Sequence, residues 1–244
     1  GRALFGAWAV ALFLPTATVT WLLTAMTRRP ATAWALGHRM APALLRAIGV
    51  PLAVHGLQHL PPGPCVLVSN HGSYLDGMLL VAALPRPFVF VAKRELQRQF
   101  VAGTYLKRLG TDFVERFEAR QSVADAERLA DVVRRGRSLA VFPEGTFVAR
   151  PGLLPFHLGA FMAAARAGVP VVPVVISGHR ELLPAGRWWP RRAALAVTVH
   201  AAIPPPDEAA DLFAGAARLR EAARRVIAAG LESPATGLDA DNAA

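Results

Sequence analysis

The stretch Val169-Pro170-Val171-Val172-Pro173-Val174-Val175-Ile176 is a short, continuous apolar run. Strands of a parallel sheet that is covered by helices on both faces read as unbroken apolar runs, because neither side of the strand meets water. Strands exposed on one face alternate apolar and polar residues instead. The run therefore predicts a central strand that is covered on both faces.

Further short apolar runs lie on either side of this strand and alternate with helical patterns. Strands are expected at 52–57, 65–69, 88–92, 111–114, 138–142 and 194–200, and helices at 74–83, 99–109, 122–136, 156–167 and 207–229. Ser122 is expected to start its helix and Asp207 to cap the last one. This alternation predicts an α/β fold with a mostly parallel central sheet flanked by helices.

The N-terminal segment from Ala3 to Thr27 contains no charged residue. At about 1.5 Å per residue, a helix of this length just reaches across a bilayer. Pro15 lies at its middle and is expected to kink it. Arginines occur on both sides, at Arg2 and at Arg28-Arg29, so the positive-inside rule gives no clear orientation. The alternative is a hydrophobic helix buried in a soluble core.

A second, amphipathic helical pattern follows from Ala31 to Gly49. The two segments together predict an N-terminal membrane anchor of two helices, residues 1–49, which either spans the bilayer once or dips into one leaflet. The flanking arginines favour the one-sided anchor. A single α/β domain is expected at 50–231, and a polar, frayed tail at 232–244.

The composition limits the class of protein. With 53% hydrophobic residues the chain is not disordered, and its single cysteine, Cys65, excludes an intramolecular disulfide framework and gives no support for a zinc cluster. The net charge is +10, and all basic residues except Lys93 and Lys107 are arginine. Such a charge fits an anionic membrane, a phosphorylated substrate or nucleic acid. No basic cluster has the spacing of a nucleic-acid motif, so the membrane ranks first and no nucleic-acid partner is expected.

The segment Asn70-His71-Gly72-Ser73-Tyr74-Leu75-Asp76 follows a predicted strand and enters a predicted helix. Ligands of α/β sheets bind at such junctions. If the segment coils, the carboxylate of Asp76 reaches one imidazole nitrogen of His71 and makes the other a better base. The alternative is a helix-capping Asn70 beside an incidental histidine. A serine hydrolase using Ser73 is disfavoured because no Gly-x-Ser-x-Gly elbow is present.

Three further strand ends carry candidate site residues. Phe142-Pro143-Glu144-Gly145-Thr146 follows one strand, Arg116 closes the segment Gly110–Arg116 after another, and Lys93 ends a third. A carboxylate beside a glycine, which lets backbone approach a ligand, is typical of a binding site. The remaining histidines His38, His179 and His200 show no partner pattern, and His55 and His59 are expected to be exposed.

These blocks, in this order, resemble the glycerolipid acyltransferase family typified by 1-acylglycerol-3-phosphate acyltransferase. The first is similar to its Asn-His-x-x-x-x-Asp motif, the segment ending at Arg116 to Gly-x-x-Phe-x-x-Arg, and 142–146 to Phe-Pro-Glu-Gly-Thr. The run 169–176 resembles its Val-Pro-x-x-Pro-Val block. The resemblance covers about residues 51–200, and the N-terminal helices look like the family's membrane anchor.

The resemblance implies an acyl transfer that needs no metal and no resident cofactor. The acyl donor would be acyl-CoA or acyl-carrier protein, the acceptor a lysophospholipid, and the location the cytoplasmic face of the inner or plasma membrane. His71 would act as the base and Asp76 would orient it. The implied acceptor-binding residues are Asn70, which shapes the turn or helps the oxyanion site, Lys93, Arg116, Glu144, Gly145 and Thr146.

The sequence also departs from the family pattern. Phe147 and Val148 stand where arginine and serine are frequent, and His157 stands where a lysine is expected. Arg150 could supply a missing cation. The acceptor could therefore be lysophosphatidate, another lysophospholipid or a hydroxylated lipid, and a catalytically silent, membrane-anchored lipid binder is the remaining alternative. The loop containing Trp188-Trp189 is expected at the lipid interface rather than as an ordinary turn.

Overall fold

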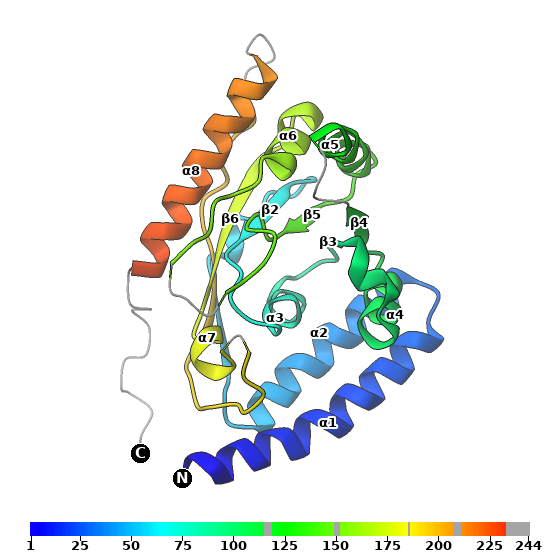
Figure 1. The fold of residues 1–244 in the computed structure, drawn as a ribbon, viewed down its shortest axis with the longest axis vertical. Coiled ribbons are helices and arrows are strands. Elements are labelled where there is room, and N and C mark those ends of the chain that lie inside the picture. The colour runs from blue at the N-terminus through cyan, green and yellow to red at the C-terminus, as the bar shows by residue number, and fades with distance from the viewer. Residues whose placement is uncertain (115–118, 149–151, 185, 207–210, 233–244) are drawn as a thin grey trace.

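The computed structural model describes residues 1–114, 119–148, 152–184, 186–206 and 211–232, with the backbone alone for 119–123. At its centre lies a seven-stranded sheet in the order β1-β7-β6-β2-β5-β3-β4 (Figure 1). The strands are β1 Leu52–His55, β2 Val66–Ser69, β3 Val89–Lys93, β4 Asp112–Val114, β5 Leu139–Val141, β6 Val171–Ser177 and β7 Leu195–Val199. Every neighbouring pair is parallel except β6 and β7. The predicted, mostly parallel sheet is confirmed.

Eight α-helices surround this sheet in the described part of the chain. They are α1 Arg2–Met26, α2 Pro30–Ala47, α3 Asp76–Ala83, α4 Phe100–Arg108, α5 Ala119–Arg134, α6 Gly159–Ala167, α7 His179–Leu182 and α8 Leu212–Glu232. Two short 3-10 helices, η1 Leu57–His59 and η2 Arg94–Arg98, complete the elements.

Strand β6 shows how the sheet is covered on both faces. Val171 and Val175 pack into one core cluster with residues of α5, α6 and α8. Val172, Val174 and Ile176 pack into the other, with residues of α2 and α3. All of these β6 side chains are buried, which confirms the predicted central strand.

Three helices begin at least three residues away from the predicted position. Helix α6 begins at Gly159 rather than at 156, because the backbone N–H of His157 donates to Pro143 O at 2.8 Å and holds the preceding residues against the loop after β5. Helix α8 begins at Leu212, while the predicted cap Asp207 and the predicted tail after Glu232 lie outside the described residues. Helix α5 begins at Ala119, three residues before Ser122.

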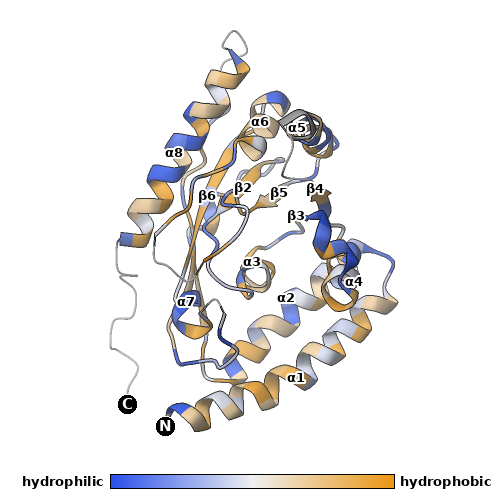
Figure 2. Cartoon of the chain, in the orientation of Figure 1, coloured by the Kyte–Doolittle hydropathy of each residue, from blue (hydrophilic) through white to orange (hydrophobic). Residues whose placement is uncertain are grey.

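Helix α1 is the one described helix that is long and apolar enough to cross a membrane. It runs through Pro15 without a break, and Figure 2 shows it as a mostly hydrophobic band along the edge of the molecule. Many of its large side chains are exposed: Met26 is 81% exposed and Leu4 76%. The indole N–H of Trp8 donates to Ala47 O at the end of α2, and that of Trp21 to Val101 O in α4.

Helix α2 belongs to the hydrophobic core. Its residues Trp34 and Leu45 are buried in the same cluster as Leu67 of β2. The Trp34 ring lies 6.0 Å from the ring of Phe90 on β3, centroid to centroid. The second N-terminal helix therefore joins the first to the sheet and does not stand apart as a free anchor.

Candidate active site

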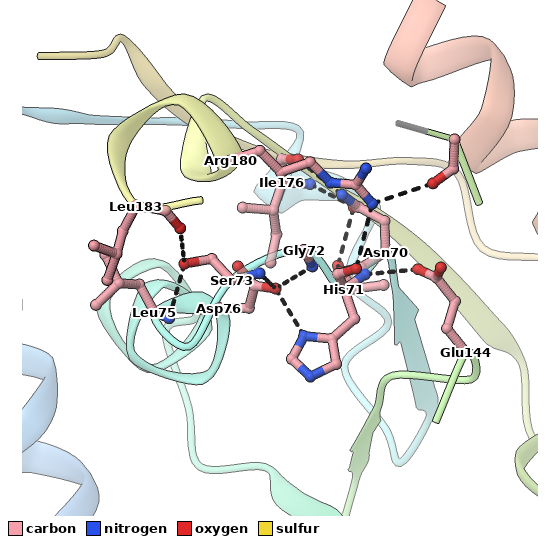
Figure 3. Close-up of polar contacts among 12 residues, drawn as sticks. Asn70, His71, Gly72, Ser73, Leu75, Asp76, Glu144, Ile176, Arg180 and Leu183 are labelled. Carbon is pink, nitrogen blue, oxygen red and sulfur yellow. Dashed lines mark hydrogen bonds and ion pairs between the residues drawn. The ribbon is translucent and has the colours of Figure 1, made fainter. Parts of the chain in front are cut away.

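The centre of the candidate site is the pair formed by His71 and Asp76, at the carboxyl end of β2. Asp76 Oδ2 lies 2.8 Å from His71 Nδ1 and also accepts hydrogen bonds from the backbone N–H groups of Gly72, at 2.7 Å, and Ser73, at 3.0 Å (Figure 3). Asp76 is completely buried and is the first residue of α3. The three donors curl the backbone after β2 around one carboxylate oxygen, so the predicted contact between the two side chains is present.

This geometry fixes how the imidazole of His71 can act. An ionised carboxylate only accepts hydrogen bonds, so the proton of a neutral His71 resides on Nδ1 and the lone pair on Nε2. Its ring stacks on Phe142, with centroids 4.3 Å apart, and meets the ring of Phe147 edge-on at 4.5 Å. The side chain of His71 is 18% exposed. An oriented imidazole with a basic Nε2 is suited to take a proton from a substrate.

Gly72 provides the space that this turn needs. A Cβ atom at this position would lie 2.3 Å from His179 Nε2 and 2.4 Å from Arg180 Nε, both side chains of α7. Either distance is far inside van der Waals contact. Only glycine therefore allows the loop that carries His71 to pack against α7.

Asn70 connects the loop to the neighbouring strand β6. Its Nδ2 donates to Ile176 O at 2.9 Å, and its Oδ1 accepts from Ile176 N at 2.8 Å. The side chain is completely buried. Of the two roles expected for Asn70, shaping the turn fits this geometry, because both polar atoms of its amide bind the backbone of β6.

Glu144 connects the two loops that leave β2 and β5. Its Oε1 accepts from His71 N at 2.8 Å (Figure 3). Its Oε2 accepts from Leu154 N at 2.7 Å. Burial raises the pKa of Glu144 above its ordinary value, although these two backbone donors and the charge of Arg180 oppose the change. The family resemblance implies that Glu144 holds the acceptor, and this stays a prediction. In the structure each oxygen accepts a hydrogen bond from a backbone N–H, one of them that of His71.

Two more side chains hold the loops around His71 by hydrogen bonds to their backbone, and these contacts were not predicted from the sequence. An Nη atom of Arg180 donates to His71 O at 3.4 Å and to Gly152 O at 3.1 Å. The hydroxyl of Ser73 donates to Leu183 O at 3.1 Å and accepts from Leu75 N at 3.3 Å. Ser73 is thus bound to backbone rather than to His71, which argues against the serine-hydrolase hypothesis.

The predicted acceptor-binding residues reach the site to different degrees. Lys93 ends β3 beside Val114 of β4, at the same edge of the sheet as His71, and is half-buried. Gly145 occupies a left-handed turn with φ of 74°, and Thr146 after it is exposed. Arg116 and Arg150 lie outside the described residues.

An aromatic ladder leads from His71 to the surface. The ring of Tyr74 meets that of Phe147 edge-on at 4.8 Å and stacks on the 77% exposed Trp188 at 5.6 Å. The neighbouring Trp189 lies directly against Gly6 of α1. A Cβ atom added to Gly6 would be only 2.1 Å from Trp189 Nε1. The loop that contains both tryptophans therefore joins α1 to the surroundings of His71.

An apolar cavity of about 380 Å³ lies between α1, α2, α3 and α4. Tyr74 lines it and also belongs to the aromatic ladder, so the cavity ends beside the ring that contacts Phe147. Its other large lining side chains are Phe13, Trp21, Met40, Leu44, Met78, Val81, Val101 and Tyr105. Such a lining suits a hydrocarbon chain.

Comparison with known proteins gives a consistent result. The family model described as Acyltransferase matches residues 51–177. The chain is 37% identical over 135 residues to a chloroplastic 1-acyl-sn-glycerol-3-phosphate acyltransferase of Brassica napus, covering 54% of this chain and 39% of the relative. A relative of the same description from Chlamydomonas reinhardtii is 31% identical over 189 residues. The match covers 76% of this chain and 54% of the relative. The chain thus spans about half the length of the curated relatives it matches.

Among solved structures, the chain is similar to the 1-acyl-sn-glycerophosphate (LPA) acyltransferase PlsC from Thermotoga maritima. The TM-score is 0.71, the sequence identity is 23%, and the match covers 94% of each chain. At this identity the likeness establishes the fold: a mostly parallel sheet flanked by helices, preceded by an apolar N-terminal helix.

Proposed function

The chain belongs to the acyltransferase family, and from that premise we propose that it transfers a fatty acyl group from an acyl thioester to the free hydroxyl of a lysophospholipid. The preferred acceptor is 1-acylglycerol-3-phosphate, which gives phosphatidate. The relatives from Brassica napus and Chlamydomonas reinhardtii carry this activity in their names. The observation that carries the proposal is the His71–Asp76 pair, whose 2.8 Å contact leaves Nε2 as the base.

The reaction follows from this geometry. His71 Nε2 takes the proton of the acceptor hydroxyl as its oxygen attacks the thioester carbonyl. The imidazolium that forms is stabilised by the buried carboxylate of Asp76. Collapse of the tetrahedral intermediate breaks the carbon–sulfur bond, and the thiolate takes the proton back from His71 Nε2, so the products are an ester, a free thiol and a neutral His71. The nearby hydroxyl of Ser73 is bound to backbone, which supports direct transfer without an acyl-enzyme.

The apolar cavity gives the acyl chain a place beside the base. A chain that lies between α1 and α4 would bring its thioester end toward Tyr74, Phe147 and His71. Burial of methylene groups there contributes about 0.8 kcal/mol each. The proposed donor is acyl-CoA or an acylated carrier protein, both of which are acyl thioesters.

The acceptor side carries the finer proposal. Arg116 would bind the acceptor phosphate, with Lys93 and Arg150 as further cations. Phe147, in contact with the His71 ring at 4.5 Å, makes one side of the base apolar where the family resemblance leads us to expect arginine. This observation favours, as the second candidate, an acceptor other than lysophosphatidate: another lysophospholipid or a hydroxylated lipid.

Helix α1 is the proposed membrane contact, on the cytoplasmic face. It is held to α2 and α4 by Trp8 and Trp21. Helix α4 ends with the charged Lys107 and Arg108, and α2 contains Arg39 and Arg46. A spanning α1 would draw these charges into lipid, so we propose that α1 lies in the interface of one leaflet with its exposed apolar side chains inserted.

The test is transfer of a labelled acyl group to lysophosphatidate in vesicles, with acyl-CoA and acyl-carrier protein as separate donors. His71→Ala should reduce kcat about 10²–10⁴-fold, because it removes the base. The matched control His55→Ala removes an exposed histidine on β1 and should be as active as wild type. Equal, measurable transfer by wild type and His71→Ala would refute the role of His71 as the base, and transfer by neither protein above background would favour the silent lipid binder. A parallel panel of acceptors decides between lysophosphatidate and the alternatives.

A further inference from the structure

Three buried polar atoms beside the active site have no hydrogen-bond partner among the described residues: Asp76 Oδ1, His179 Nδ1 and His179 Nε2. Asp76 is completely buried and His179 is only 2% exposed. A buried polar group that is left unsatisfied costs about 1–3 kcal/mol, so native proteins pair such atoms directly or through a buried water.

These atoms belong to neighbouring side chains. His179 is the first residue of α7, and a Cβ added to Gly72 would lie 2.3 Å from its Nε2. The backbone N–H of the same Gly72 donates to the other oxygen of Asp76 at 2.7 Å. Figure 3 shows Arg180, the next residue of α7, reaching across this loop. The His179 ring therefore packs against the turn that wraps Asp76.

The charge state of His179 follows from its surroundings. Burial lowers the pKa of His179 below its ordinary value. The negative charges of Asp76 and Glu181 oppose this change, while the positive charges of Arg180 and of a protonated His71 add to it. A neutral imidazole carries one N–H donor and one acceptor, and the donor is what the second oxygen of Asp76 lacks.

We propose that His179 is a positioning residue whose ring N–H is linked to Asp76 Oδ1 through one buried water. Asp76 is then held at both oxygens: Oδ2 by His71 and the turn, and Oδ1 by His179 from α7. The role of His179 in turnover rests on the proposed base catalysis by His71. Its hydrogen bond is a property of the folded protein and can be tested without turnover.

The kinetic test compares His179→Phe, which keeps a ring but removes the donor, with His179→Gln, which restores a donor. We expect His179→Phe to lower kcat about fivefold to tenfold, the effect of one hydrogen bond, with the thioester KM changed less than twofold. The acidic limb of its kcat–pH profile should move to higher pH. Without the hydrogen-bonded link to His179, the carboxylate of Asp76 stabilises a proton on the His71–Asp76 pair more strongly. His179→Gln should recover most of kcat.

The matched control is His200→Phe, which removes another histidine with a buried, unpartnered Nε2, located beside Gly230 of α8. It should leave kcat and the pH profile unchanged. If His179→Phe retains the wild-type kcat and profile, or if Phe and Gln are equally impaired without any shift of the profile, His179 only fills space and the proposal is overturned.

Nuclear magnetic resonance of histidine-labelled protein separates this proposal from the proposed function. The His179 ring should stay neutral to lower pH than an exposed histidine does, because burial lowers its pKa, and should show one slowly exchanging N–H that is absent in His179→Gln. A ring that titrates as in water and exchanges quickly would overturn the proposal, even in an active enzyme. The protected N–H in a protein that transfers no acyl group would uphold the hydrogen bond and refute the proposed function instead.

Discussion

The turn after β2 and the helix α1 both depart from the usual rule that polar side chains are exposed and apolar ones buried. The turn buries polar side chains, whereas α1 exposes apolar ones. At the turn, Asn70, Asp76 and Glu144 are polar and at most 3% exposed. Along α1, Leu4 and Met26 are apolar and more than three-quarters exposed. Charged groups are rarely buried without partners, and contiguous apolar surface rarely faces water. We propose that each inversion marks a place where the chain meets something else: reactants at the turn and lipid at α1.

The largest expected effect tests whether the buried charge at the turn is used in catalysis. Asp76→Asn keeps the shape but removes the charge and places an amide where His71 Nδ1 and two backbone N–H groups now converge. We expect kcat to fall about 10³–10⁴-fold, because the imidazole loses its fixed tautomer. Circular dichroism should show an intact fold. A variant that folds and retains more than a tenth of wild-type kcat would contradict the orienting role.

The next effect tests whether the exposed apolar surface of α1 binds membranes. Replacing Leu14, Leu22 and Met26 together by Ser should weaken partition into anionic vesicles by about 10²-fold, given roughly 1 kcal/mol lost per side chain. None of the three lines the cavity, so thermal stability should change little. Point substitutions are preferable to deleting residues 1–49, since that deletion removes Trp34 and Leu45 from the core.

The control for this experiment changes the same number of exposed apolar residues on another helix. Replacing Leu212, Phe213 and Leu231 of α8 by Ser should leave vesicle binding intact. If both triple variants lost vesicle binding equally, exposed apolar residues anywhere on the surface would contribute to it. Helix α1 would then not be a specific membrane contact.

The smallest effect distinguishes support from chemistry within the turn itself. Glu144→Gln turns one of two accepting oxygens into a donor that faces the backbone N–H of His71 or Leu154. We expect a loss of about 1–3 kcal/mol in the free energy of unfolding and a roughly tenfold lower kcat. The KM for the acceptor should stay near that of wild type, whereas a selective rise of that KM would support the predicted acceptor contact.

The sequence predicted those parts of the molecule that depend on short-range pattern. The apolar runs located the strands, and the contact of His71 with Asp76 spans only five residues. The roles of Glu144 and Asn70 depend instead on partners 73 and 106 residues away, which a single sequence does not reveal. The antiparallel pairing of β6 with β7 was missed for the same reason.

His179 shows the limit most clearly. In the sequence it is one histidine among seven, without a partner pattern, just after a strand. Its proximity to Asp76 arises because β6 lies beside β2 in the sheet, so that the residues after both strands meet at one edge. Neither periodicity nor spacing carries that information. The one sign of this contact in the sequence is the glycine at position 72. The fold is needed to show that this glycine makes room for His179 and Arg180.

The contact between Trp21 and Val101 has a consequence for synthesis of the chain. The two residues are 80 positions apart. A ribosome adds about 5–20 residues per second, so α1 emerges roughly 4–16 s before the segment that becomes α4. During that interval the part of its apolar surface that later packs against α4 meets only solvent, a chaperone or a bilayer. A membrane close to the ribosome would therefore shield α1 from aggregation until α4 is synthesised. The membrane on which the protein is proposed to act would then also assist its co-translational folding.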